Sequence, residues 1–276
     1  MNEQRIQRVL VWVGSAGLLA FCLGPFAYMV AVSLADRADF LLPAVSPAWT
    51  LEHYANVLSG ESLHFVRMLV NSLVVSLCSA LVAVFLACLG AYAITRLRLP
   101  GKMLVLFGVL AVAMFPQVGI VGYLYQMMIR LGWINTYQAL VLPYVAWTVP
   151  LSLWVLVGYF SQIPRELDTA ALVDGCSRWT ILWRVIFPVA APGVFSVFLL
   201  AFIFAFNEFM FALMLTSDYR ARTVPVGIAL FQGLHGQTPW GTIMAASVVT
   251  TLPVVVLALI FQRRIIGGLT QGAVKG

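Results

Sequence analysis

The stretch PRELDTAALVDGCSRWTILWRVIFPVAAP, from Pro164 to Pro192, decides the fold of this chain. It is the only sizeable polar island in the second half of the sequence, and long apolar runs flank it on both sides. Its charged residues are three acids and three arginines, namely Glu166, Asp168, Asp174, Arg165, Arg178 and Arg184. A polar island between apolar runs predicts a loop that leaves the membrane and presents a surface to another molecule.

Within this stretch, the order of helix start and stop signals predicts two short helices. Pro164 can begin the first helix, and acidic residues are favourable in its first turn. Asp174 and Gly175 interrupt it, because glycine suits the left-handed position that ends a helix. Ser177 is placed to cap a second helix, which Pro188 is expected to end. The loop at 161–188 is therefore predicted to be folded rather than a tether.

Composition places the chain in a membrane. Hydrophobic residues make up 62% of the 276 residues and charged residues only 9%, against about 25% charged in soluble domains. A membrane-spanning helix needs about 20 apolar residues, and it satisfies its own backbone hydrogen bonds. Six runs meet this requirement and predict an all-α polytopic protein: Val9–Leu34, Val66–Thr95, Met103–Met128, Ala139–Phe160, Val189–Thr216 and Gly241–Phe261.

Basic residues orient these spans. If the N-terminus is cytoplasmic, eleven of the 16 lysines and arginines fall in cytoplasmic segments. The other five fall in outer segments: Arg37, Arg67, Arg130, Arg220 and Arg222. Lysine and arginine are enriched in the cytoplasmic segments of membrane proteins. The chain is therefore predicted to lie in a cell membrane, with both termini and the loop at 161–188 on the cytoplasmic side. The first run has a basic start like that of a signal peptide, but its apolar length favours an uncleaved helix.

The third run contains Met114-Phe115-Pro116, where proline removes an intrahelical hydrogen bond and predicts a kink. A kinked helix can line a pathway, and it can equally be a packing feature.

Sequence motifs for catalysis and for metal binding are missing from the chain. No Walker A motif occurs, so this chain is not expected to bind ATP. His53, His64 and His235 share no metal-ligand spacing, and no aromatic-interleaved basic patch suggests nucleic acid. The chain is predicted to be non-catalytic, with no metal and no cofactor of its own.

One acidic residue lies inside a predicted span, in the sequence Asn207-Glu208. An acid in hydrocarbon is costly unless it is paired, protonated or facing a cavity. Two hypotheses remain open. Asn207 and Glu208 are candidates for a pathway or gate. The alternative is an interhelical hydrogen bond that sets packing, with Asn71 and Ser72 as candidate partners.

The loop resembles the cytoplasmic "EAA" loop of binding-protein-dependent ABC importer permeases. That family has Glu-Ala-Ala, then Asp-Gly three residues on, then a pair of prolines. The matching residues are Ala170, Ala171, Asp174, Gly175, Pro188 and Pro192. Thr169 stands where the family has glutamate, and Glu166 and Asp168 are the nearby acids that could replace it.

The resemblance extends along nearly the whole chain, and several segments are similar to those of the carbohydrate branch of the family. The matching segments are Ala91-Tyr92-Ala93, Pro100-Gly101-Lys102, Asn207-Glu208-Phe209, Pro225-Val226-Gly227, Trp240-Gly241, Ala245-Ala246-Ser247 and Gly268–Gly276. Phe206 departs from the tryptophan that commonly precedes Asn-Glu in the family.

The resemblance implies a type I ABC importer permease fold. It divides the chain into an N-terminal segment (1–65), a transmembrane domain (66–262) and a cytoplasmic tail (263–276). It also implies four partners: a second permease subunit, two ATPase subunits that bind ATP and Mg²⁺, an extracytoplasmic binding protein, and a sugar. The alternatives are a stand-alone secondary transporter that uses Glu208, and a permease for a phosphoester or an amino acid.

Residue roles follow from the same resemblance. The expected ATPase-coupling residues are Glu166, Asp168, Ala170, Ala171, Asp174, Gly175, Arg178 and Pro188. Ala170 and Ala171 are expected at the closest approach to the ATPase, and Asp174 either pairs with it or caps the turn.

Two further segments carry predicted contacts. The outer loop Phe231–Trp240 is polar and glycine-rich, and its candidates for contact with the binding protein are Gln232, Gly233, His235 and Gln237. The tail Gly267–Gly276 is expected to be too glycine-rich for a stable helix of its own. It is expected to extend toward the ATPases through Thr270 and Lys275.

Overall fold

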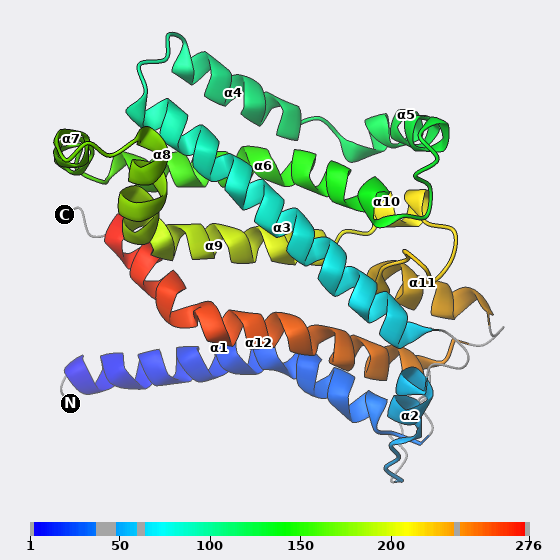
Figure 1. The fold of residues 1–276 in the computed structure, drawn as a ribbon. Coiled ribbons are helices and arrows are strands. Elements are labelled where there is room, and N and C mark those ends of the chain that lie inside the picture. Colours follow the sequence, from blue (N-terminus) through cyan, green and yellow to red (C-terminus); the bar gives the residue numbers. More distant parts are fainter. Residues whose placement is uncertain (1–2, 37–47, 60–63, 235–237, 274–276) are drawn as a thin grey trace. The chain divides into compact units, whose positions relative to one another are not determined.

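The regular structure of this chain is helical throughout the part that the computed structural model describes, residues 3–36, 48–59, 64–234 and 238–273 (Figure 1). In these ranges, five helices are long and apolar enough to cross a membrane, and the bent pair α4–α5 brings the number to six if it counts as one span. The predicted all-α membrane architecture is confirmed.

The helices follow one another in this order: α1 (Glu3–Ser33), α2 (Glu52–Leu58), α3 (Phe65–Arg96), α4 (Lys102–Ala113), α5 (Gln117–Arg130), α6 (Tyr137–Ser161), α7 (Glu166–Val173), α8 (Arg178–Ile181), the π-helical turn η1 (Leu182–Ile186), α9 (Phe187–Phe206), α10 (Met210–Leu215), α11 (Val224–Leu234) and α12 (Trp240–Ala273).

The chain forms two compact units, and the smaller one comprises residues 1–66 and 227–252. In it, the Ser33 hydroxyl hydrogen-bonds to the Tyr54 hydroxyl at 2.7 Å and joins the end of α1 to α2. His53 of α2 lies 3.1 Å from the carbonyl oxygen of Ala35. Most of α1 is exposed within this unit.

The larger unit comprises residues 67–226 and 253–276, and it contains the loop that decides the fold. Helices α4, α6 and α9 lie side by side, with α6 in contact with both α4 and α9, and α3 runs obliquely to them (Figure 1). Their core is aliphatic and aromatic, and its largest fully buried side chains include Phe160, Phe202 and Leu156. At Gly193 a side chain would collide with the Tyr159 ring, so glycine permits the close approach of α9 to α6.

The third predicted span is broken rather than kinked. Helix α4 ends at Ala113, α5 begins at Gln117, and their axes differ by 85°. Pro116 occupies the N-cap position of α5 with an extended backbone. Proline has no N–H to donate, and it disfavours the helical conformation of the preceding residue, so the chain leaves the helix before it.

The fifth predicted span begins and ends earlier than expected. A continuous run of helix extends from Arg178 to Phe206, and the chain breaks at Asn207–Phe209 before the short helix α10. The prediction that Pro188 ends the second loop helix is wrong. Pro188 lies in the first turn of α9, directly after the π-helical turn η1. Such a turn accommodates a proline, because its hydrogen bonds join residues five positions apart instead of four.

Candidate functional site

The loop between α6 and α9 folds as its sequence predicts at the turn. Helix α7 ends at Val173, and the Cys176 N–H donates to the carbonyl oxygen of Ala171 at 2.9 Å. Gly175 has φ +79°, the left-handed conformation that costs glycine least. The Ser177 hydroxyl accepts a hydrogen bond from the Thr180 N–H at 3.2 Å and caps α8. The predictions for Gly175 and Ser177 are confirmed.

Two arginine side chains, buried Arg96 and exposed Arg165, tie this loop to the membrane helices. Arg96, the last residue of α3, donates to the carbonyl oxygens of Phe160 and Ile163 at 3.1 and 2.8 Å. It also pairs with the Asp168 carboxylate of α7 at 3.3 Å, and only 4% of its side chain is exposed. Arg165 adds a hydrogen bond to the carbonyl oxygen of Thr95 at 3.2 Å. The loop is therefore rigidly joined to α3 and α6.

The two alanines of the motif lie on different faces of α7. Ala170 is exposed, whereas Ala171 is only 8% exposed and belongs to the hydrophobic core of this chain. The expectation that both alanines meet a partner is wrong for Ala171. Adjacent helical residues point about 100° apart, so a helix packed on its own protein directs one of the two inward.

The outward face of α7 is an open surface with a shallow hollow of about 440 Å³. Its lining residues recur at helical spacing and are Arg165, Glu166, Thr169, Ala170, Val173 and Asp174. Val173 is 84% exposed. We call these six residues the α7 outer face. It combines small, apolar and acidic side chains, which suits a groove with apolar walls and a basic rim.

The candidate coupling residues divide between this face and the protein interior. Glu166 and Asp174 are exposed, and no described residue hydrogen-bonds to the Asp174 carboxylate, so Asp174 does not cap the turn with its side chain. Asp168 instead faces inward to Arg96. Arg178 is exposed and lies next to the Tyr92 hydroxyl.

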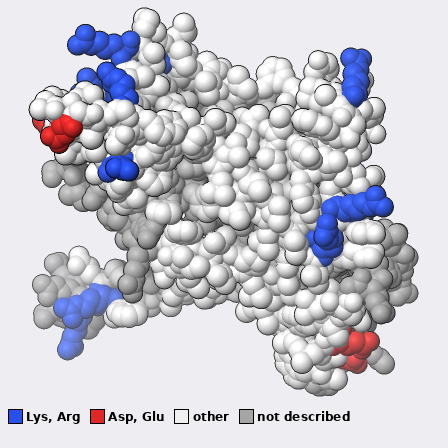
Figure 2. All heavy atoms as spheres, viewed as in Figure 1, with Lys and Arg blue, Asp and Glu red and all other residues white. Residues whose placement is uncertain are grey.

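Figure 2 shows how charge is distributed on one face of the larger unit. Basic and acidic side chains lie over α7, α8 and the α3–α4 connection at one end, and basic side chains lie over α5 and the loop before α11 at the other. The visible surface of the helices between these ends is uncharged. An uncharged belt between two charged ends is what a bilayer requires.

Glu208 caps a helix. Its carboxylate oxygens accept hydrogen bonds from the N–H groups of Phe211 and Ala212, at 2.9 and 3.2 Å, at the start of α10. The residue is 7% exposed. Asn207 does not bond to it but donates to the carbonyl oxygen of Ile203 at 2.8 Å. A buried carboxylate with two backbone donors at a helix N-terminus is well stabilised, so its presence in a span needs no ion pathway to explain it.

Asn71 and Ser72 are not partners of Glu208, contrary to one of the two hypotheses for that residue. The Asn71 amide donates to the carbonyl oxygens of Tyr219 and Arg222, both at 2.9 Å, and accepts from the Tyr137 hydroxyl at 2.6 Å. The Ser72 hydroxyl accepts from the Val224 N–H at 2.8 Å. Both side chains hold the loop before α11 against α3.

A second hydrogen-bonded cluster holds the same loop from the other side. The Asn135 amide donates to the Asp218 carboxylate at 2.8 Å and accepts from the Ser217 N–H at 3.2 Å. The hydrogen bond from Asn135, followed by that from the Arg220 N–H, lowers the pKa of the Asp218 carboxyl from its usual value. Asp218 therefore stays ionised at neutral pH.

Comparison with known proteins identifies the family. Residues 80–270 match the family described as "Binding-protein-dependent transport system inner membrane component". The trehalose/maltose transport system permease protein MalG of Thermococcus litoralis is 52% identical over 277 aligned positions, covering 100% of both chains. This chain belongs to that family of inner-membrane permeases. It is thus a multi-pass membrane protein and a transport permease.

Other permeases of this family are similar over most of their length. The sulfoquinovosyl glycerol transport system permease protein SmoH of Agrobacterium fabrum is 38% identical, covering 97% of this chain and 94% of that one. The trehalose transport system permease protein SugB of Mycobacterium tuberculosis is 37% identical over 94% of both.

A solved structure shares the fold of this permease. A chain of a bacterial ABC transporter involved in the import of alginate superposes with a TM-score of 0.77, covering 96% of this chain and 98% of that chain at 19% identity. The predicted type I importer permease fold is confirmed by this match.

The remaining candidate residues of the permease lie in or beside parts that the structure does not describe. His235, Gln237 and Lys275 fall outside the described residues. The predicted outer loop starts later than expected, because α11 is helical through Gln232 and Gly233 to Leu234.

The predicted tail is also shorter than expected, because α12 continues through Thr270 to Ala273. Its glycines do not prevent this, since extending an existing helix avoids the cost of nucleation.

Sequence reasoning missed Arg96, Asn71 and Asn135 as structural anchors of the permease. Arg96 is one of the eleven basic residues predicted to be cytoplasmic, and its place at the end of a span, next to a tight turn, suits it to bond carbonyl oxygens. Asn71 was considered only as a partner of Glu208, and its actual partners lie about 150 positions away in sequence.

Proposed function

We propose that this permease is one of two membrane subunits of an ATP-driven sugar importer. The observation that carries the proposal is the α7 outer face, a small-residue surface held rigidly on the membrane helices by Arg96 and Asp168. A rigidly mounted, exposed helix transmits movement, whereas a loose loop does not.

An ATPase subunit is the proposed partner of this face. Ala170 lets the wall of a groove approach closely, Val173 supplies apolar contact, and Glu166 and Asp174 pair with basic residues at the rim. Two such ATPases, one for each permease subunit, bind ATP and Mg²⁺, and this chain binds neither. The second permease subunit is related to this one but not identical with it.

Coupling follows from the anchoring of the loop. When the ATPases close on ATP, a displacement of α7 passes through the Arg96–Asp168 pair to α3, and through the carbonyl oxygens of Phe160 and Ile163 to α6. Since α6 packs against both α4 and α9, these helices move together. Movement of such a body against the second permease gives alternating access.

The substrate class is proposed from the relatives. Trehalose appears in the names of the permeases from Thermococcus litoralis and Mycobacterium tuberculosis, and maltose in the name of the first. This chain resembles both permeases along nearly its whole length. Both termini are proposed to be cytoplasmic, as the distribution of basic residues favours. An extracytoplasmic binding protein would deliver the sugar to the opposite end, where Arg220 is exposed.

Co-expression with a candidate ATPase subunit and a candidate second permease from the same genome tests the proposal. We expect a stable complex that, in proteoliposomes with the binding protein, takes up a disaccharide and hydrolyses ATP faster when the binding protein is loaded. A chain that transports sugar alone, driven by an ion gradient, would contradict it. A complex that imports only phosphoesters or amino acids would contradict the substrate class.

A further inference from the structure

Two interrupted helices of the larger unit, α4 and α9, line one cavity. The first interruption is Met114–Pro116, between α4 and α5, and the second is Asn207–Phe209, between α9 and α10. Helix α4 and helix α5 together are apolar enough to form a membrane span, yet neither half reaches the length of about 20 residues that a span needs.

The first interruption is exposed in this chain. Met114 is 85% exposed and Phe115 is 58% exposed. Their N–H groups make short-range bonds of 3.2 Å to Ala111 and Val112, and no side chain caps the first N–H groups of α5. Exposed irregular backbone is not tolerated in hydrocarbon, because its polar groups have no partner there. This surface must therefore meet water or another protein, and not lipid.

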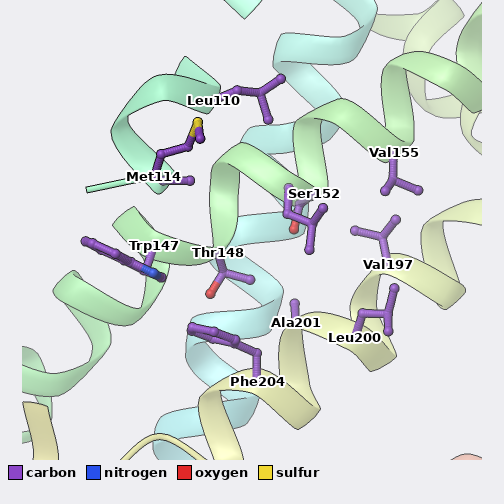
Figure 3. Close-up of a pocket in the computed structure, with 12 residues that line it drawn as sticks. Leu110, Met114, Trp147, Thr148, Ser152, Val155, Val197, Leu200, Ala201 and Phe204 are labelled. Carbon is purple, nitrogen blue, oxygen red and sulfur yellow. The ribbon is translucent and has the colours of Figure 1, made fainter. Parts of the chain in front are cut away.

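The cavity beside this interruption has a volume of about 500 Å³ and lies between α4, α6 and α9 (Figure 3). Met114, Trp147 and Phe204 gather toward one side of it. Phe204 lies three residues before Asn207, and the Trp147 ring contacts Phe211 of α10 with centroids 6.1 Å apart. The cavity thus borders the first interruption directly and ends about one helical turn before the second.

The cavity also offers a hydroxyl that has no hydrogen-bond partner among the described residues. Ser152 lines it and is 3% exposed, and no described residue hydrogen-bonds to it. The neighbouring Thr148 instead uses its hydroxyl on the carbonyl oxygen of Tyr144. Ser152 can both donate and accept, and the Trp147 ring has an electron-rich face. The other lining residues are apolar.

We propose that Met114, Phe115, Trp147, Ser152 and Phe204 border the aqueous translocation pathway, and that Trp147 and Ser152 contact the sugar as it passes. The apolar face of a sugar ring suits the indole face, and one sugar hydroxyl suits Ser152. A single ring and a single hydroxyl make a weak contact, and a pathway needs contacts weak enough to release the solute. This inference rests on the proposed function.

Cysteine labelling of the assembled importer tests the pathway. In a variant with Cys22, Cys78, Cys88 and Cys176 replaced, Met114→Cys should react with a membrane-impermeant thiosulfonate added from the outer side. The matched control is Leu81→Cys, on the unbroken helix α3, where the side chain is 54% exposed. We expect at least a tenfold faster reaction at position 114, slowed when the loaded binding protein and sugar are present.

Equal reaction rates at positions 114 and 81 would overturn the inference. The cysteine-free parent separates this failure from failure of the proposed function. If the parent imports the sugar and Met114→Cys does not react, only the pathway assignment is wrong. If the parent does not import any sugar, the proposed function is wrong.

Contact with the sugar is tested by Ser152→Ala and by Trp147→Phe and Trp147→Ala. We expect Ser152→Ala and Trp147→Ala to lower the uptake rate of the purified complex several-fold at unchanged binding-protein affinity, and Trp147→Phe to retain most of it. Melting temperatures of the complexes report any loss of folding. If both alanine variants have the uptake rate and the melting temperature of the parent, the proposed contact with the sugar is wrong.

Discussion

At the scale of single residues, the structure assigns most intramembrane polar groups to backbone hydrogen bonds. Glu208 caps α10, and Asn71 holds two carbonyl oxygens of the loop before α11. In both cases a side chain replaces the hydrogen bonds that a broken helix or a loop leaves unmade. Such residues are costly to change without being part of the transport chemistry.

Glu208→Gln should lower the stability of the complex while sparing transport. The amide can accept only through its one oxygen, so one of the two charged hydrogen bonds is lost, at a cost of about 1–2 kcal/mol. The melting temperature should fall, and uptake per folded complex should equal that of the parent. Glu52→Gln, at an exposed position, is the control. Loss of uptake in complexes that remain folded would restore Glu208 as a pathway residue.

Asn71→Ala should release the loop before α11. The substitution leaves the carbonyl oxygens of Tyr219 and Arg222 without their donor, at about 1–3 kcal/mol for each group that stays buried. Trypsin should then cleave after Arg220 much faster than in the parent, as measured by mass spectrometry. The exposed Asn56 provides the control variant, Asn56→Ala. Cleavage at the parent rate would mean that the Asn135 cluster alone holds the loop.

At the scale of elements, helical phase decides which residues of the coupling loop are available. The resemblance to the EAA loop predicts that α7 is a contact helix, but it could not show that Ala171 points inward and Ala170 outward. That choice depends on the packing of α7 against α8 and η1, and on the ion pair of Asp168 with Arg96, a residue far away in sequence.

Ala170→Arg and Ala171→Arg should therefore fail in different ways. Arginine at position 170 lies on the α7 outer face and should block the ATPase while the permease stays folded. Arginine at position 171 must enter the core, which costs several kcal/mol for an unpaired charge, so the loop itself should unfold. Co-purification of the ATPase and limited proteolysis of the loop distinguish the two. Identical protease sensitivity in both variants would contradict the assignment of faces.

Gly175→Val should disturb coupling through the backbone of the turn. A β-branched residue at φ +79° is strained by about 1–2 kcal/mol. Gly175→Asn should cost less, because asparagine tolerates the left-handed region. We expect the ratio of sugar imported to ATP hydrolysed to fall in the order parent, Asn, Val. An equal ratio in all three would show that the turn geometry is not needed for coupling.

The element boundaries show what sequence patterns can predict in such a chain. Composition identified the apolar spans, because length and hydropathy are sufficient for that, and glycine and serine marked the turn of the loop correctly. The prediction that Pro188 ends a helix was wrong, because a π-helical turn can accommodate a proline. No sequence pattern predicts such a turn. The interruption at Asn207 was missed because the residues on both sides are apolar.

At the scale of the whole molecule, one end of the larger unit carries the α7 outer face, and the other carries the loop held by Asn71 and Asn135. The helices between them are joined to α7 through Arg96. A structure with an anchored surface at each end and a cavity along interrupted helices suits alternating access. In that mechanism, movement on one side of the membrane opens the transport pathway on the other side.

Photo-cross-linking from the α7 outer face tests the central claim most directly. A photoreactive amino acid is placed at Val173, which is 84% exposed, in a complex shown to import sugar. The control position is Tyr123 of α5, which is 76% exposed and lies at the other end of the unit. We predict a covalent adduct with the ATPase subunit from position 173 and none from position 123. A transporting complex that gives no ATPase adduct from position 173 would contradict the account.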